Sequence, residues 1–147
     1  MTLETEKATN EAQIRALMED WADAVRSKDI DRLLSHYALD MVAFDAWGPL
    51  RVDLPTMRTH WEQCFAGHDG PVGLEHHEVQ ITAGDDVAFV HCLICMHGKL
   101  RDGNEHTFWG RGTICFKKID GRWLVTHEHA SAPFDPMSGE ACMNLEP

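Results

Sequence analysis

The chain has 147 residues, of which 44% are hydrophobic, and its formal net charge is −11. This length suits a single domain, residues 1–147, with its own hydrophobic core. A surface this acidic repels phosphate backbones and anionic lipids, so neither nucleic acid nor a membrane is an expected partner. The first residues lack the basic and apolar regions of a secretory signal, and no apolar run reaches the roughly 20 residues of a membrane helix. We therefore expect a cytoplasmic protein.

The first part of the chain predicts helices. Apolar residues spaced three or four apart predict a long helix over residues 8–27. Asp29 can cap a second helix, in which the same apolar spacing extends as far as Tyr37. A short strand is predicted at residues 41–45, and Asp53 can then cap a third helix.

After Gly70-Pro71 the pattern changes from helices to extended segments. Four of these are predicted, at residues 72–83, 86–100, 105–118 and 122–132. The dipeptides Gly84-Asp85, Asp102-Gly103 and Asp120-Gly121 separate them, and each is a turn signal. Helices followed by such a meander predict an α+β domain, with the helices on one face of an antiparallel sheet. The tail after Pro133 is expected to be irregular.

The last hairpin predicts which side chains face inward. A type I turn with Gly121 in a left-handed bulge would pair odd-numbered residues of the two strands. One face would then carry Trp109, Arg111, Thr113 and Cys115 opposite Trp123, Val125, His127, His129 and Ser131. We interpret this mixture of aromatic and polar groups as the wall of a concave pocket. A solvated face is the alternative, and a two-residue turn would reverse the pairing.

Several stretches of the chain form a recognisable series: Tyr37 to Asp45, Pro49-Leu50, Trp61 with Phe65, Ala88 to His91, Trp109 to Thr113, Phe116 to Lys118, Asp120 to Trp123 and His127 to Pro133. In their order and spacing they resemble the SnoaL-like branch of the NTF2-like superfamily, particularly the group known as ketosteroid isomerase homologues. The resemblance implies a cone in which a strongly bent sheet wraps around the helices and leaves a cavity at its wide end. It also implies a homodimer, for which the opposite sheet face, with Phe108, Ile114 and Phe116, offers a convex surface.

Asp45 is the first candidate catalytic residue. It follows the predicted first strand, where the steroid isomerases of this superfamily place a general-base carboxylate, and such a base removes a proton next to a carbonyl group. The alternative is a structural Asp45 that bonds neighbouring backbone or pairs with Arg111. The chain departs from the isomerases in having no match for their oxyanion-hole pair, since its only tyrosine, Tyr37, is expected on the second helix.

His127 and His129 are the second candidates, because residues two apart on a strand share a face. His91 joins them if its strand turns the odd-numbered side inward. Histidine relays protons near neutral pH, and three histidines with Asp45 could instead hold a metal ion. The alternative is a polar lining in which these groups bond each other, Ser131 and Glu128. We expect acid–base partners at His127 and His129, with no metal and no cofactor.

The remaining candidates would hold a small-molecule ligand. Substrate-binding roles are predicted for Arg111, Thr113, His91, Trp109, Trp61 and Tyr37. An arginine inside a pocket needs a counter-charge, which Asp45 or a ligand carboxylate could supply. The remaining histidines, His60 among them, are assigned no role. The resulting hypothesis is cofactor-independent acid–base catalysis on a partly apolar carbonyl compound, of isomerase, cyclase or lyase type; the alternative is a non-catalytic ligand-binding or dimerisation module.

Overall fold

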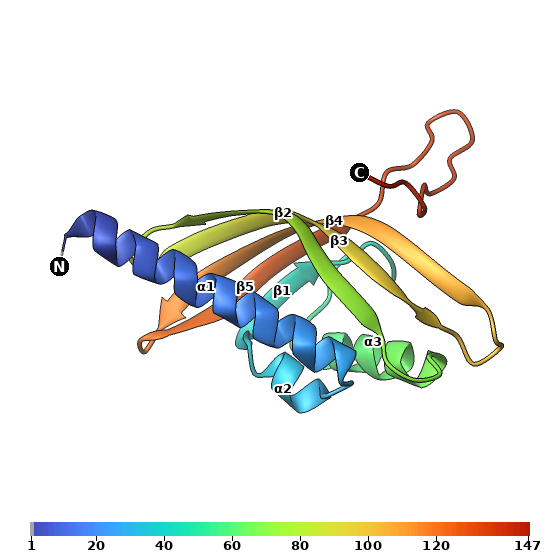
Figure 1. Cartoon of the computed structure of the whole chain (residues 1–147), viewed down its shortest axis with the longest axis horizontal. Helices are drawn as coiled ribbons and strands as arrows, with labels where there is room; N and C mark the ends of the chain where they lie inside the picture. The colour runs from blue at the N-terminus through green and yellow to red at the C-terminus, as the bar shows by residue number, and fades with distance from the viewer. Residues whose placement is uncertain (1) are drawn as a thin grey trace.

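The computed structural model describes residues 2–147 and has the predicted α+β architecture (Figure 1). Its elements are α1 (Leu3–Arg26), α2 (Ile30–Leu34), β1 (Tyr37–Phe44), α3 (Leu54–Gly67), β2 (Gly73–Ala83), β3 (Val87–Lys99), β4 (Glu105–Ile119) and β5 (Arg122–Ser131). The five strands form one curved sheet in the order β1-β5-β4-β3-β2. β2 to β5 are an antiparallel meander, as predicted, and β1 pairs with β5 in parallel.

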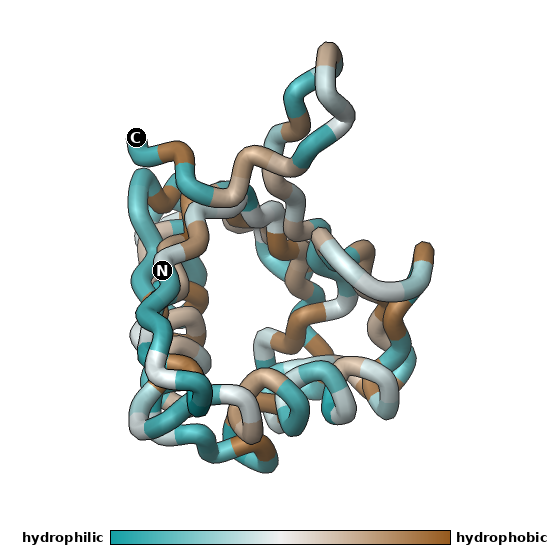
Figure 2. The backbone as a smooth tube through the Cα atoms, turned by 90° about the vertical axis from the view of Figure 1, so that its right-hand side faces the viewer, coloured by the Kyte–Doolittle hydropathy of each residue, from teal (hydrophilic) through white to brown (hydrophobic). Residues whose placement is uncertain are grey.

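The first helix packs its apolar stripe against the sheet. Ile14, Ala22 and Val25 are fully buried, and α1 contacts β2. The helix begins at Leu3, earlier than predicted, because the Thr2 side chain accepts a hydrogen bond from the Thr5 amide at 3.2 Å. Its first turns are polar and exposed, so apolar periodicity could not reveal them. Brown hydrophobic and teal hydrophilic positions alternate along the helices and strands in Figure 2, as expected for elements with one buried side.

The second helix is short, and the prediction that it includes Tyr37 was wrong. Asp29 caps it as expected, but it ends at Leu34 and Tyr37 begins β1. Tyr37 pairs with Val125 of β5, and the Val125 amide donates to the His36 carbonyl at 2.8 Å. This pairing joins residues far apart in the sequence, which helical spacing cannot anticipate.

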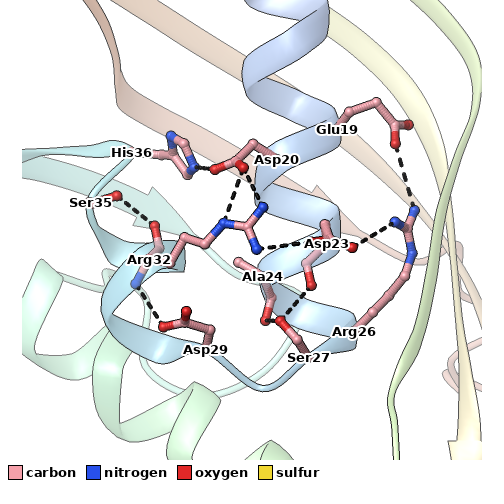
Figure 3. A network of polar contacts seen from close by, with 10 residues as sticks. All are labelled: Glu19, Asp20, Asp23, Ala24, Arg26, Ser27, Asp29, Arg32, Ser35 and His36. Atoms are coloured by element: carbon pink, nitrogen blue, oxygen red, sulfur yellow. Dashed lines mark hydrogen bonds and ion pairs between the residues drawn. The ribbon is translucent and has the colours of Figure 1, made fainter.

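Charged side chains fasten α2 to α1 (Figure 3). Arg32 donates to Asp20 and, at 2.9 Å, to Asp23, while His36 Nε2 lies 2.6 Å from the second carboxylate oxygen of Asp20. The hydrogen bonds from Arg32 are the main cause that lowers the pKa of Asp20 below its usual value. Because His36 directly precedes β1, this network holds the start of β1 close to α1.

The third helix follows the predicted signals. The Asp53 side chain accepts from the Thr56 amide at 2.9 Å, Pro55 lies in the first turn and the helix ends at Gly67. The tail after Ser131 contains an isolated bridge between Phe134 and Ala141 and loops away from the sheet, as Figures 1 and 2 show. It returns to β4 at Met143, whose carbonyl accepts from the Trp109 amide at 3.1 Å. It is irregular, as predicted.

The last hairpin differs from the prediction in a way that changes the site. Ile119 pairs with Arg122, so the turn has two residues, and both Asp120 and Gly121 have positive φ, as a type I′ turn requires. A bulge then lies between the pairs Phe116–Val125 and Cys115–His127. Trp123 and Val125 before the bulge are buried, whereas beyond it Glu128 and Ala130 take the inner face.

The predicted inner and outer faces of β4 are therefore exchanged. Odd-numbered residues of the two strands do pair beyond the bulge, as predicted, but they lie on the outer face. Arg111 is exposed and donates to Ser131 Oγ at 3.1 Å. Phe108, Ile114 and Phe116, expected on the convex side, border the interior instead. The reason is the two-residue turn, which pairs the buried Val125 with Phe116 and so places the even-numbered residues of β4 inside. The bulge in β5 then turns the residues after Thr126 to the opposite face.

Candidate functional site

A cavity of about 140 Å³ lies between α1, α3 and the inner face of the sheet. Its apolar walls include Leu17, Met57, Leu74, Ile94, Phe108 and Ile114. The polar side chains on it include Tyr37, Asp45, His60, His76, Thr113 and Glu128. Engineered cavities of roughly 150 Å³ with apolar walls bind benzene, so this space suits a ligand the size of one ring. Within residues 2–147, no lysine or arginine borders it.

Glu128 is the strongest acid–base candidate in this cavity. It comes from the inner face of β5, and Tyr37 Oη on the neighbouring β1 donates to Glu128 Oε2 at 2.9 Å. Part of the side chain opens onto the cavity, but burial in the protein raises the pKa of Glu128 to about 7; the bond from Tyr37 opposes this rise and the charge of Asp45 adds to it. Glu128 therefore exchanges a proton near neutral pH.

Tyr37 and Trp21 form a directed chain of donors toward Glu128. Trp21 Nε1 donates to Tyr37 Oη at 3.1 Å, and Tyr37 donates its own hydroxyl hydrogen to the carboxyl. Burial, followed by the nearby charge of Glu128, raises the pKa of Tyr37 well above its usual value, so the phenol keeps its proton. Because Oε2 receives this bond, Oε1 remains for a ligand.

Asp45 and His60 form a second polar position. Asp45 lies directly after β1, and its Oδ2 is 3.6 Å from Nδ1 of His60 on α3. The His60 ring is buried and stacks on Trp47, with centroids 4.3 Å apart. Asp45 borders the cavity, whereas the sequence had given His60 no role. The partner suggested for Asp45, Arg111, lies on the outer face instead.

Aromatic side chains enclose the rest of the cavity. Trp21 meets Trp61 edge-on with centroids 5.6 Å apart, and Trp61 contacts Phe65 at 5.5 Å. The His76 ring lies 5.8 Å from Trp21, and burial lowers the pKa of His76, which keeps that imidazole neutral. Of the predicted ligand contacts, Trp61, Tyr37 and Thr113 border the cavity.

The other predicted site residues are dispersed over the sheet. Thr113 and His129 border the cavity but are exposed residues, while His127 Nδ1 donates to the Val42 carbonyl at 2.5 Å on the outer side. His127 and His129 both contact the exposed Phe44 ring, at 4.8 and 5.7 Å. The prediction that His127 and Arg111 point inward with His129 was wrong: the bulge in β5 turns His127 outward, and Arg111 lies on the outer face of β4, so that of these three only His129 borders the cavity.

His91 and Trp109 also fall outside the cavity. His91 is exposed and pairs with Thr113 across β3 and β4, and Trp109 contacts His77 with centroids 5.0 Å apart. In the part of the chain from residue 2 onward, no three His, Cys, Asp or Glu residues are grouped to hold a metal ion. The proposed cluster of His91, His127 and His129 with Asp45 therefore does not form.

Sequence reasoning missed Glu128 and His60 as site residues. Glu128 lies between two histidines, and continuous alternation from Trp123 and Val125 placed it outside. The position of this carboxylate close to the buried Trp123 and Val125 was the one sign that it could lie inside. The sequence does not show the bulge that turns it inward. His60 sits on the face of α3 that also carries Met57, so helical spacing could have identified it.

Comparisons with known proteins agree with this fold. The SnoaL-like domain family matches residues 14–135, and no curated protein matches the chain. An NTF2-like protein of unknown function from Pseudomonas putida KT2440 is 35% identical, with a TM-score of 0.86, and the match covers 95% of this chain and 98% of that chain.

Two more distant structures share the fold. A ketosteroid isomerase-like protein from Erwinia carotovora atroseptica is 19% identical, with a TM-score of 0.69 over 83% of this chain and 95% of that chain. The association domain of C. elegans CaMKII is 18% identical, with a TM-score of 0.67 over 85% of this chain and 97% of that chain. Among the helices of residues 2–147, none is long and apolar enough to cross a membrane. The family match and the shared fold confirm the resemblance, and the chain belongs to the SnoaL-like domain family of the NTF2-like superfamily.

Proposed function

We propose that this chain binds a small, partly apolar carbonyl compound in its cavity and moves a proton on it, with Glu128 as the acid–base group. The reaction would be of isomerase, cyclase or lyase type and would need no cofactor. The observation that carries the proposal is a carboxyl with a pKa of about 7 that opens onto an aromatic cavity and receives one hydrogen bond from Tyr37.

The chemistry follows from the protonation of Glu128. Near neutral pH the ionised form accepts a proton from the carbon next to a carbonyl group, and the acid form returns it to another position. A base with a pKa near the working pH is both present in the right form and strong enough to act. Apolar walls shield the reacting carbon from most water, while Glu128 exchanges its bound proton with the solvent between turnovers, so that the reaction introduces deuterium in D₂O.

Asp45 remains a candidate base, as the sequence suggested. Its carboxylate borders the same cavity and faces His60 rather than the Tyr37 hydroxyl. His127 is not included, because its contacts with Val42 and Phe44 lie on the outer side. His129 borders the cavity but is exposed and contacts the outer Phe44 ring, so it is not included either. Two carboxylates in one apolar site can take different roles when their surroundings differ.

Deuterium exchange tests the proposal without knowledge of the natural substrate. Cyclohexanone in D₂O would be followed by NMR for loss of its α-protons, with native protein and with Glu128→Gln. We expect catalysed exchange to fall about 10²- to 10⁴-fold in the variant. Glu105→Gln, at the exposed start of β4, is the matched control and should leave exchange unchanged. Full exchange by Glu128→Gln, with loss in Asp45→Asn, would assign the base to Asp45 instead.

The alternative is a ligand-binding or dimerisation module without catalysis. The observation in its favour is that β1 and β3 expose apolar side chains: Val42 and Phe44 are each 39% exposed, and Phe89 is 46% exposed. The CaMKII relative is an association domain by name. Sedimentation equilibrium would reveal a homodimer, and a native protein that exchanges no protons on any cyclic ketone would favour this alternative.

A further inference from the structure

His60 contains a polar atom that the fold leaves without a partner. Its Nδ1 is buried, and among residues 2–147 it is the one buried side-chain nitrogen or oxygen with no hydrogen bond. Native proteins satisfy nearly all such atoms, so a partner outside the chain is expected. His60 and its neighbour Asp45 both border the cavity, so a ligand held there lies close to this unmet bond.

The His60 ring is held in place by its neighbours. Trp47 stacks on it at an interplanar angle of 28°. Gly48 has a φ of +88°, and a Cβ built there would lie 3.1 Å from His60 Cε1, so only glycine fits this approach without displacing the ring. The distance of 3.6 Å between His60 Nδ1 and Asp45 Oδ2 is too long for a hydrogen bond between them.

We propose that His60 Nδ1 and Asp45 Oδ2 together seat a hydroxyl group of the cavity ligand. One oxygen can lie about 2.8 Å from both atoms, and a hydroxyl can accept from the His60 N–H while donating to the Asp45 carboxylate. A carbonyl oxygen has no hydrogen to donate to Asp45. This inference rests on the proposed function, because it requires the cavity to bind a ligand.

The charges of the cavity restrict the ligand further. Glu128 and Asp45 both border it, and none of the arginines and lysines of residues 2–147 does. Carboxylate or phosphate ligands would be repelled and left without a counter-charge. With a volume of about 140 Å³ between aromatic walls, the site fits an uncharged compound of one ring that carries a hydroxyl group.

Phenol and toluene are suitable probes, because they differ by a hydroxyl in place of a methyl group. Titration calorimetry would measure both with native protein, with His60→Phe and with His60→Asn. Phenylalanine keeps the ring that stacks on Trp47, whereas asparagine keeps a nitrogen donor close to the position of Nδ1. The exposed His97→Phe is the matched control.

Native protein should bind phenol at least tenfold more tightly than toluene. His60→Phe should abolish this preference and keep toluene binding, while His60→Asn should restore part of it. Equal binding of both probes by native protein would overturn the inference. So would a preference that survives in His60→Phe but disappears in Glu128→Gln, since the hydroxyl would then sit at Glu128. Cyclohexanone exchange would still report separately on the proposed function.

Discussion

Tyr37 and Glu128, 91 residues apart in the sequence, are joined by a hydrogen bond of 2.9 Å between neighbouring parallel strands. The tyrosine is the donor, and its own oxygen accepts from Trp21 at 3.1 Å. One side of the carboxyl is thus held by the fold and the other is free for chemistry. The pairing of β1 with β5 therefore places the hydrogen bond that influences the protonation of Glu128.

Tyr37→Phe should raise the pKa of Glu128 above its value of about 7. The bond from Tyr37 stabilises the charged carboxylate, so its removal favours the protonated form. Carbon-13 NMR of labelled glutamate would follow the titration directly. Trp21→Phe keeps the Tyr37–Glu128 bond and should shift the pKa less. A lower pKa in Tyr37→Phe would contradict the described role of the bond.

Glu128 should also make the native fold less stable as pH rises. Its folded pKa of about 7 lies above the ordinary 4.5, so the folded state binds the proton more tightly than the unfolded state. Stability from this group is full below about pH 4.5 and falls as pH rises toward and through 7, by at most roughly 3–4 kcal/mol. Urea unfolding of native protein and Glu128→Gln at pH 5 and pH 8 checks this. The difference between the two proteins isolates Glu128, and an equal pH dependence in both would refute the prediction.

Substitutions on the outer face should leave the chemistry unchanged. Arg111→Ala removes a bond to Ser131, and His127→Ala removes a bond to the Val42 carbonyl; neither bond reaches the cavity. Exchange of cyclohexanone α-protons should stay within about twofold of native, with a loss of stability of about 1 kcal/mol or less. A hundredfold loss of exchange in Arg111→Ala, with the fold intact by circular dichroism, would mean that this arginine acts in the site.

Two phenylalanines test the assignment of inner and outer faces. Phe116 is 1% exposed and belongs to the core, whereas Phe89 on the neighbouring strand is 46% exposed. Phe116→Ala should cost about 3–5 kcal/mol of unfolding free energy, and Phe89→Ala less than about 1 kcal/mol. Urea denaturation measures both, and similar losses would show that the faces are assigned incorrectly.

The sequence determined the features that depend on neighbouring residues. The cap at Asp53, the end of α3 at Gly67 and the turn at Asp120-Gly121 follow from local hydrogen bonds and backbone freedom. Apolar spacing identified the buried stripe of α1. These local preferences, with the resemblance to the SnoaL-like branch, were sufficient to predict the α+β architecture and the meander.

Only the tertiary structure decided which side chains meet in the cavity. The extra residue at Thr126 turns Glu128 inward and His127 outward, and the parallel pairing with β5 brings Tyr37 to the carboxyl. A strand alternates its faces with a period of two, so a one-residue bulge inverts every later assignment while hardly changing the local sequence pattern. Contacts of β5 with other strands and helices stabilise the bulge, and the spacing of residues within β5 does not reveal those contacts.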